Sequence, residues 1–342
     1  MSETRIEAVD PHDDEAVAAW HHVYATAECY ESEDFATAWQ LEEMRVMLQD
    51  AGSRVAFRAW SGLQDGRCVA TGFLRVPLQS NLERAEMAVH VLPEERRRGL
   101  GSVMAAHLEH EVRALGRSVI GADVQWDAAG GSGGDGRPGP EFARAVGFEL
   151  ALREVQRELV LPVDDAMLSR MADEISPHHR GYSLRSFVGP VPDELVQEWA
   201  TLSGSLMTEA PTGEMDLEPE TVTVQQQRDA EEVIRKQGRT KYNTVALDVD
   251  GTLVAYTDLA TTVHEPGRAY QWGTLVRRDH RGHRLGMAVK LANLRLLQQE
   301  RSDIERLITW NAESNAHMVA VNEDLGFCPV AHFGGFQKRL TG

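Results

Sequence analysis

The chain has 342 residues, of which 42% are hydrophobic and 26% are charged. This is the composition of an ordinary globular protein, and the length is sufficient for two domains of about 150 residues. The 53 acidic and 35 basic residues give a formal net charge of −18. Such a charge favours solubility, and it disfavours nucleic acids and anionic membranes as partners. It suits a cationic or amine-bearing small molecule.

Targeting signals and cysteine usage indicate a cytoplasmic protein. No apolar run reaches the roughly 18 residues of a membrane span. The N-terminus is polar and acidic, without the basic-then-apolar order of a signal peptide. Cys29, Cys68 and Cys328 are odd in number and far apart. We therefore expect a reduced cytosolic chain with neither a disulfide framework nor a metal site.

The first predicted elements form a hairpin. Two strand-like runs, Arg54–Phe57 and Cys68–Gly72, flank the pair Asp65-Gly66, and Asp-Gly between β-rich runs is a hairpin signal. A further strand-like run, Glu86–Val91, follows and leads to a basic, glycine-bearing turn, Arg96–Gly101.

The turn is predicted to open an amphipathic helix. Apolar residues recur at helical spacing from Leu100 to Leu115. Downstream, the glycine-rich run Ala129–Gly136 predicts a mobile loop, and Gly147-Phe148 follows it.

The second half repeats this order. Asp250-Gly251 separates the strand-like runs Thr244–Leu247 and Leu253–Tyr256. A third run, Tyr270–Val276, precedes the turn Arg281–Gly286, which opens a second apolar helix. Asp250 follows Asp65 by 185 residues, and the second turn follows the first by the same 185 residues. The sequence thus indicates one duplicated unit.

The third landmark of the repeat departs from that offset. Gly326-Phe327 follows Gly147-Phe148 by 179 residues, because the second half lacks the glycine-rich insertion. A polar, helix-like stretch lies between the two copies. We therefore predict an N-terminal domain of residues 1–163, a connector of residues 164–181 and a C-terminal domain of residues 182–342.

The repeated unit resembles the Gcn5-related N-acetyltransferase (GNAT) superfamily, whose signature is Gln/Arg-x-x-Gly-x-Gly/Ala between a strand and a helix. The first half matches it at Arg96, Gly99 and Gly101. The second half has Arg284 where the middle glycine is expected, with Gly282 two residues earlier. The resemblance implies an α/β (α+β) chain of two consecutive GNAT folds, each a mixed, mostly antiparallel sheet flanked by helices. The layout is similar to that of the tandem family that includes mycothiol synthase.

The resemblance also implies that the chain binds acetyl-CoA. Unpaired N–H groups at a helix N-terminus, the helix dipole and close glycine backbone suit a pyrophosphate. In the second half, Asn315, Met318 and Asn322 share one helix face, which in the family contacts CoA. The residues expected to bind the cofactor are Val89, Val91, Arg96, Arg97, Arg98, Gly99, Leu100, Gly101 and Ser102, together with Leu275, Val276, Arg281, Gly282, His283, Arg284, Leu285, Gly286 and Asn315.

Acyl transfer to an amine needs a base, an oxyanion donor and a proton for the leaving thiolate. The family's base position holds Glu86 in the first half and Gln271 in the second. The usual tyrosine acid is replaced by Ala143 and Asn322. The candidate catalytic residues are therefore Glu86 and Asn322, with Tyr256, Tyr270 or water as other proton sources.

The sequence thus predicts an N-acyltransferase that moves an acetyl or similar group from acetyl-CoA to a small-molecule amine by direct attack. Which half is catalytic stays open, and the chain is expected to be a monomer or homodimer. One alternative is a non-catalytic CoA-binding or scaffold protein. Another is a Mg²⁺-dependent phosphatase of the haloacid dehalogenase type, because Asp248–Thr252 matches Asp-x-Asp-Gly-Thr.

Overall fold

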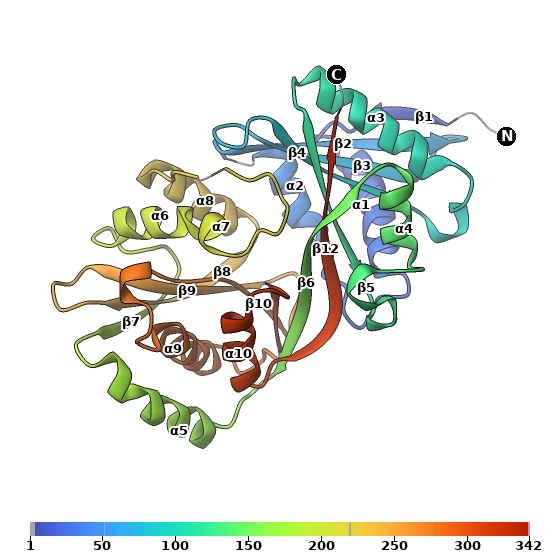
Figure 1. The fold of residues 1–342 in the computed structure, drawn as a ribbon. Helices are drawn as coiled ribbons and strands as arrows, with labels where there is room; N and C mark the ends of the chain where they lie inside the picture. The colour runs from blue at the N-terminus through green and yellow to red at the C-terminus, as the bar shows by residue number, and fades with distance from the viewer. Residues whose placement is uncertain (1–3, 51, 219, 341–342) are drawn as a thin grey trace. The chain divides into compact units, whose positions relative to one another are not determined.

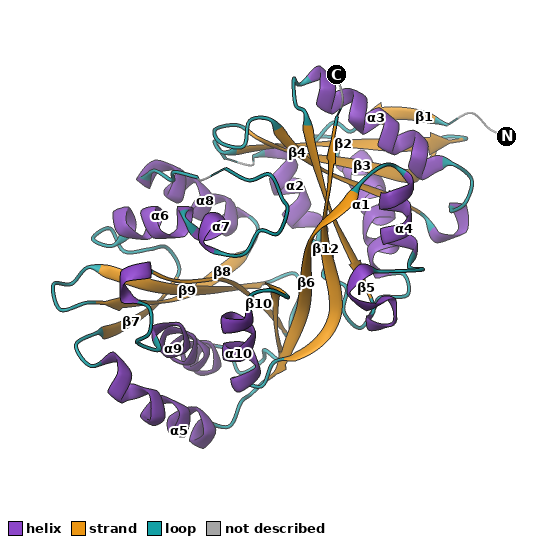
Figure 2. Ribbon diagram, in the orientation of Figure 1, coloured by secondary structure: helices purple, strands orange, loops and turns teal. Residues whose placement is uncertain are grey.

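The computed structural model describes residues 4–50, 52–218 and 220–340, and it forms two compact α/β units (Figures 1 and 2). The first unit comprises the described residues up to Val155, Gly213–Leu217 and the chain from Val330 onward. The second comprises Gln156–Thr212 and Glu218–Pro329. The units are therefore interleaved along the sequence, which the repeat did not predict. The domain boundaries at 163 and 182 stay a prediction.

The first unit is a mixed, mostly antiparallel sheet, as the sequence predicted. Its strand order is β1-β2-β3-β4-β5-β12-β6; β4 and β5 run parallel, and the pairs β1–β2, β2–β3, β3–β4 and β5–β12 are antiparallel. The strands are β1 (Arg5–Ala8), β2 (Val55–Gln64), β3 (Arg67–Pro77), β4 (Arg84–Val91), β5 (Val119–Trp126), the first part of β6 (Glu149–Val160) and most of β12 (Cys328–Arg339).

Helices cover both faces of this sheet. Met104 of α3 packs against Leu74 on one face, while the ring of Trp20 of α1 lies tilted against that of Phe73 on the other. The bounds are α1 (Asp14–Cys29), α2 (Leu41–Gln49), α3 (Leu100–Ala114), α4 (Pro138–Ala145) and the 3-10 turns η1 (Pro93–Glu95) and η2 (Ala128–Gly133). The start of the chain thus supplies the first strand and two helices of this unit.

The second unit repeats this plan with the strand order β6-β11-β10-β9-β8-β7. Its own strands are β7 (Ser183–Val188), β8 (Arg239–Leu247), β9 (Leu253–Thr262), β10 (Arg268–Val276) and β11 (Arg306–Ala312). Its helices are α5 (Asp165–Ile175), α6 (Val196–Gly204), α7 (Leu206–Glu209), α8 (Val224–Lys236), α9 (Leu285–Glu300), α10 (Ala316–Asp324) and the turns η3 (Ser176–His179) and η4 (Arg278–His280). No helix of the described chain is both long and apolar enough to cross a membrane.

The predicted connector is helical and belongs to the second unit. The Asp164 side chain caps α5 by accepting a hydrogen bond from the Met167 amide at 2.8 Å. Leu168 is fully buried in the core that α9 also lines. Burial of this apolar face against α9 holds α5 in the unit, so the segment is more than a spacer.

The glycine-rich run, expected as a mobile loop, forms the 3-10 turns of η2. The Trp126 indole donates a hydrogen bond to the Gly131 carbonyl at 2.7 Å, and Arg144 donates to the Gly133 carbonyl. These side chains satisfy backbone groups that a run of glycines leaves unpaired.

Both Asp-Gly hairpins form. Asp65 and Gly66 both adopt positive φ, 51° and 79°, as a two-residue type I′ turn requires. In the second hairpin the Asp248 carboxylate accepts hydrogen bonds from the amides of Asp250 and Thr252, at 3.0 and 2.9 Å. The Asp-x-Asp-Gly-Thr sequence therefore builds a turn. Among the described residues, no group of three or more His, Cys, Asp or Glu side chains is arranged to hold a metal ion.

The final strand completes the first unit. β12 pairs antiparallel with β5 from His332–Trp126 to Arg339–Val119 (Figure 1). Phe336 of β12 is fully buried in the core that contains Leu74 and Met104. The core of the first unit therefore depends on a strand from the end of the chain.

We expect Phe336→Ala to lower the free energy of unfolding by about 3 to 5 kcal/mol, the usual cost of removing a buried phenyl ring. Urea unfolding of the full chain measures this loss, and hydrogen exchange of the β5 amides localises it. Leu78→Ala, at a position 46% exposed, is the control and is expected to cost less than about 0.5 kcal/mol. Unchanged exchange in β5 would contradict the dependence on β12.

Candidate functional site

A slot opens between β4 and β5 because the two strands pair over three residues and then separate. Arg84, Ala85 and Glu86 pair with Val119, Ile120 and Gly121, and no later register pair joins the two strands among the described residues. β4 continues alongside β3 up to Val91. The β5-facing amides of the last part of β4 are thus available to a ligand.

The alternating direction of the backbone N–H groups along β4 identifies which amides face the slot. Leu92, next in the chain, donates its N–H to Val69 of β3. Because N–H directions alternate along a strand, the amides of Val89 and Val91 point away from β3, toward the slot. The two residues predicted to contact the cofactor on this strand therefore have the orientation that this role requires.

The turns after β4 and β10 share one backbone conformation. In the first, Arg97 and Gly99 adopt φ of 64° and 87°; in the second, the equivalent Gly282 and Arg284 adopt 87° and 56°. Each turn therefore has two left-handed positions, and glycine occupies a different one in each copy. The arginine at position 284 preserves the turn, at the strain cost of a non-glycine residue in this region.

Each turn opens a helix whose first amides lack intrahelical partners. Gly99 and Arg284 are the N-cap residues of α3 and α9, and neither side chain caps its helix. The first helical bonds are donated by Val103 and Ala288. Unpaired amides and the positive end of the helix dipole fit a pyrophosphate at either turn.

The first arginine of each turn faces the protein. Arg96 donates to the Val91 carbonyl at 3.3 Å and to the Ala27 carbonyl at 3.2 Å, and its guanidinium lies 4.9 Å from the Tyr30 ring centroid. Arg281 donates to the carbonyl of Val276 at 3.2 Å and pairs with Glu209 at 2.8 Å. These arginines anchor the turns.

The other two arginines of the first turn differ in whether they form an ion pair. Arg98 pairs with Glu95, whereas Arg97 is exposed and has no ion-pair partner among the described residues. Gly101 lies under α4, since a Cβ there would be 3.1 Å from the ring of Phe142. Ser102 is exposed beside it, in the first turn of α3.

Carboxylates gather where the first slot opens. Glu86, the predicted base, lies at the last paired position of β4, and Asp123 lies two residues beyond the equivalent point on β5. The Glu86 carboxylate is 3.2 Å from Arg75 Nη1 and 3.9 Å from Arg84 Nε. This side of the sheet faces α1, opposite α3.

Burial and like charges change the proton affinity of this group. Burial raises the pKa of Asp123 to about 7, the carboxylates of Glu86 and Glu154 add to this, and Arg84 and Arg75 oppose it. Burial also raises the pKa of Glu154 to about 7. Asp123 keeps an exposed side, so water in the slot weakens the effect and a ligand that displaces this water strengthens it. Sequence reasoning missed both residues, because only the order of the strands in the sheet brings Asp123 near both Glu86 and Glu154.

The second slot has the same opening but is satisfied internally. β10 and β11 pair only at Arg268–Tyr270 with Arg306–Ile308. A bulge in β10 follows, and the Asp258 carboxylate accepts the Gly273 amide at 2.7 Å. Gln271, at the base position, is buried and donates to the carbonyl of Asp258 at 2.6 Å. Leu275 and Val276 end the strand beyond the bulge.

The remaining side chains of the second half have local roles. Asn322 is fully buried and donates to Asn311, and Asn315 caps α10 by accepting from Met318 at 3.2 Å. Tyr270 donates its hydroxyl to Glu265. Burial, assisted by Asp258, raises the pKa of Tyr256 well above its usual value, so its hydroxyl stays protonated.

Most charged side chains around the second turn have polar partners, and the exposed Arg284 is the exception among the described residues. Glu209 binds Arg278 at 2.8 Å as well as Arg281. His283 contacts the His178 carbonyl at 3.2 Å, and His280 contacts the Tyr182 hydroxyl at 3.0 Å. Neither histidine belongs to a metal-binding group in the described residues.

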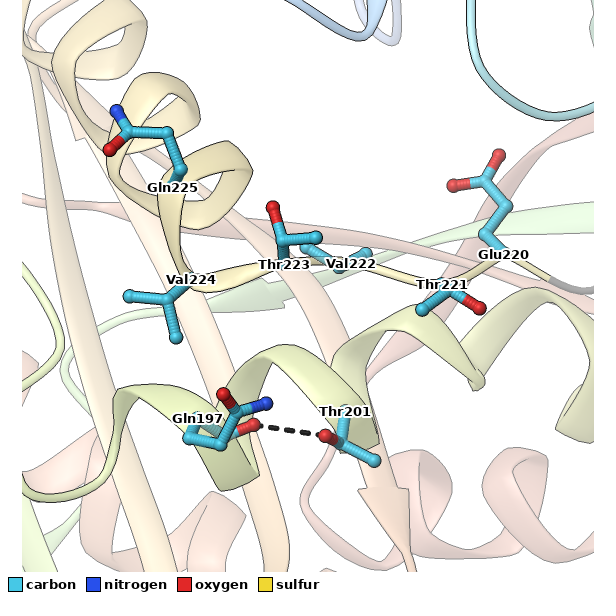
Figure 3. A pocket seen from close by; sticks show the side chains of 8 residues that line it. All are labelled: Gln197, Thr201, Glu220, Thr221, Val222, Thr223, Val224 and Gln225. Carbon is cyan, nitrogen blue, oxygen red and sulfur yellow. Dashed lines mark hydrogen bonds between the residues drawn. The ribbon is translucent and has the colours of Figure 1, made fainter.

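A shallow hollow of about 420 Å³ lies elsewhere in the second unit, between α6 and the segment that enters α8 (Figure 3). None of its lining residues belongs to a turn or slot strand, so it takes no part in the candidate site. The lining residues are Gln197, Thr201, Glu220, Thr221, Val222, Thr223, Val224 and Gln225.

Comparisons with known proteins agree with this geometry. The family described as "Acetyltransferase (GNAT) family" matches residues 20–127. The structure is similar to a tandem GNAT protein from the clavulanic acid biosynthesis pathway, determined without AcCoA, with a TM-score of 0.79, 27% identity and 99% of each chain covered. No curated protein matches the sequence.

Two more distant structures share the fold alone. A GCN5-related N-acetyltransferase from Sphaerobacter thermophilus has a TM-score of 0.63 and 16% identity, over 99% of this chain and 96% of that one. A GCN5-related glucosamine N-acetyltransferase region of a fungal multi-domain GH3 β-N-acetylglucosaminidase has a TM-score of 0.63 and 13% identity, over 99% of this chain and 38% of that one.

The shared turn conformation predicts opposite effects of two substitutions. Gly99→Ala should lower the free energy of unfolding by about 1 kcal/mol, because its φ of 87° is unfavourable for alanine. Arg284→Gly should raise the free energy of unfolding by a smaller amount. Glycine relieves the strain of the positive φ, but it also increases the conformational entropy of the unfolded chain, which offsets part of the gain. Urea denaturation of both variants measures the pair, and a shift of the same sign in both would contradict the shared geometry.

Proposed function

This chain is a tandem N-acetyltransferase of the GNAT superfamily, and from that premise we propose that its first unit transfers an acetyl group from acetyl-CoA to a small-molecule amine. The observation that carries the assignment is the unequal state of the two slots. Unpaired amides and an exposed arginine occur at both turns, with Arg97 in the first and Arg284 in the second, and the first slot adds the carboxylate of Asp123. In the second, the bulge amide of Gly273 and the side chain of Gln271 are already hydrogen-bonded.

The amides at the start of α3 would hold the pyrophosphate of acetyl-CoA, with Arg97 and the helix dipole adding positive potential. Arg96 keeps the turn attached to β4 and to the end of α1. The slot-facing amides of Val89 and Val91 would then stabilise the oxyanion that develops on the thioester carbonyl. Bound acetyl-CoA supplies the activated acyl group.

A base with a pKa near neutral suits the attacking amine. We assign Asp123 this role, with Glu86 and Glu154 keeping its proton affinity high and holding the ammonium form of the acceptor nearby. Glu86, the base predicted from the sequence, then acts through the effect of its negative charge on the pKa of Asp123. Ala143 offers no proton to the leaving thiolate, so water in the open slot supplies it.

The second unit serves as a structural partner in this proposal. Asn322 is enclosed and bonded to Asn311, which argues against direct catalysis. A carboxylate-rich slot favours a cationic acceptor over a neutral or anionic one. The free thiols of Cys29, Cys68 and Cys328 suit the predicted cytoplasmic location, and a monomer or homodimer stays the expected state.

The binding site can be tested with matched charge variants. Ser102→Glu places a carboxylate in the first turn of α3, where it stabilises the helix but repels a phosphate. Titration calorimetry with acetyl-CoA should show at least about tenfold weaker binding, near 1.4 kcal/mol, while Ser102→Gln binds like the parent protein. Arg284→Glu and Arg284→Gln report on the second turn in the same way. Loss of binding only in Arg284→Glu would assign the cofactor to the second unit, and a parent protein that binds no acyl-CoA would overturn the proposal.

The base predicts a pH profile. The deprotonated carboxylate is the active form, and its raised pKa means that protons inactivate it up to near neutral pH. The kcat for thiol release from acetyl-CoA, with 1,4-diaminobutane as a probe amine, should rise as pH increases through about 7. Asp123→Asn should lower kcat by about 10²- to 10⁴-fold and remove this limb.

Glu149→Gln is the control, because Glu149 is an exposed carboxylate of the same unit. It should leave the profile unchanged. An acid limb that survives in Asp123→Asn would assign the base elsewhere, with Glu86 the next residue to test.

A further inference from the structure

A short strap from the middle of the chain is built into the first unit. Residues 213–217 belong to this unit although their sequence neighbours belong to the second. The Glu214 amide donates to the Ala151 carbonyl of β6 at 2.8 Å. Gly213 has a φ of 59°, and a Cβ there would lie 2.2 Å from the same carbonyl oxygen. Only glycine allows the strap to approach β6 so closely.

The strap, residues 213–217, forms two hydrogen bonds with the Gln337 side chain of β12. The Asp216 amide donates to Gln337 Oε1 at 2.8 Å, and Gln337 Nε2 donates to Asp216 Oδ2 at 2.8 Å. Arg339 donates to the other carboxylate oxygen at 2.6 Å. Met215 lies over Gly335, where a Cβ would be 3.5 Å from its sulfur. These contacts fix the rotamer of Gln337.

Gln337 in turn holds a buried arginine of the slot. Its Oε1 also accepts a hydrogen bond from Arg84 Nη1 at 2.8 Å. Arg84 is only 4% exposed and lies across Gly121, where a Cβ would be 2.1 Å from Nη2. The guanidinium is thus confined beside the last paired residues of β4 and β5, where the slot opens.

We propose that Asp216 and Gln337 are positioning residues for acyl transfer in the first unit: the strap fixes Gln337, and Gln337 fixes Arg84 beside Glu86 and Asp123. This inference rests on the proposed function of that slot. Arg84 stabilises the ionised carboxylates, and its placement determines how strongly it does so. A strap encoded after the first repeat therefore tunes the base on the first repeat's sheet.

The charged groups around Asp123 determine how its pKa would change if Gln337 no longer held Arg84. Burial and the carboxylates of Glu86 and Glu154 raise the pKa of Asp123, and Arg84 and Arg75 lower it. Asp216 also attracts Arg84, and Arg339 pairs with Asp216. If Gln337 releases Arg84, the carboxylate of Asp123 loses part of its cationic support, and its pKa moves further up.

The first experiment measures this in the protein without any ligand. Carbon-13 NMR titration of aspartate-labelled protein follows Asp123, whose signal is identified as the one missing from Asp123→Asn. Gln337→Leu should raise the pKa of Asp123 above that in the parent protein. An unchanged or lowered pKa would overturn the proposal, and this readout does not depend on turnover or on acetyl-CoA.

Exchanging the carboxylate and the amide between positions 216 and 337 tests whether these residues act by positioning Arg84 or only through their charge. Gln337→Glu keeps an oxygen acceptor for Arg84 and for the Asp216 amide, but it sets two carboxylates against each other. Adding Asp216→Asn provides a donor for the new carboxylate and restores the original net charge. We expect kcat with 1,4-diaminobutane to fall at least tenfold in Gln337→Leu, to fall in each single variant of the swap, and to recover in the double variant. Failure of the double variant to recover, at parental stability, would contradict the relay.

The strap itself is tested without touching any charged group. Gly213→Ala forces residues 213–217 away from Ala151 and should reproduce the effects of Gln337→Leu on kcat and on Asp123. Gly66→Ala is the matched control, because it has a φ of 79° and nothing within 4 Å of the added Cβ. It should affect stability alone. Equal kinetic effects in both variants would overturn the role of the strap.

Acetyl-CoA affinity distinguishes failure of this inference from failure of the proposed function. The strap and Gln337 lie on the sheet face opposite α3, so the dissociation constant for acetyl-CoA should stay within twofold in all these variants. A parent protein that binds or turns over no acyl-CoA would overturn the proposed function. A parent protein that does so, with an Asp123 pKa indifferent to Gln337, would overturn only the positioning role.

Discussion

The divergence of two parallel strands is the constraint on which the rest of the first unit depends. Three pairs, from Arg84–Val119 to Glu86–Gly121, bring β4 and β5 together, and the strands then part. Beyond that point β4 has a hydrogen-bonding partner on only one side, so its remaining amides are available to a ligand. The turn, the start of α3 and the carboxylates of Glu86 and Asp123 all take their positions from this opening.

The two copies share the backbone conformation of the turn more closely than they share its amino-acid residues. Positions 97 and 282, like 99 and 284, share left-handed conformations although glycine changes place between them. The side chains diverged around this constant geometry. In the second unit Asp258 occupies the bulge amide of Gly273, which leaves an internally satisfied slot. This conserved geometry with altered hydrogen bonding is the physical basis of our proposal that the first unit is catalytic and the second structural.

The sequence predicted what is encoded locally. Asp-Gly pairs, helical periodicity and the glycine-bearing turn each require specific residues at short spacing, so the hairpins and the helices after the turns could be derived. The fold class came from the family resemblance that the turn carries. The placement of β12 depends on pairing between residues more than 200 positions apart, such as Phe336 and Ala122. No local pattern signals that pairing. The position of Asp123 near both Glu86 and Glu154 was hidden for the same reason.

The charge pattern of the slot also explains why its arginine must be buried. Neighbouring carboxylates repel each other, and without cationic support they would all bind protons and lose their value as bases. Arg75, whose side chain is 41% exposed, pairs directly with Glu86 at 3.2 Å. Arg84 adds cationic support from a fixed place, because it is confined over Gly121 and anchored by Gln337. It offsets part of the negative charge from within the sheet, which leaves the open side of the slot to the acceptor amine that we propose.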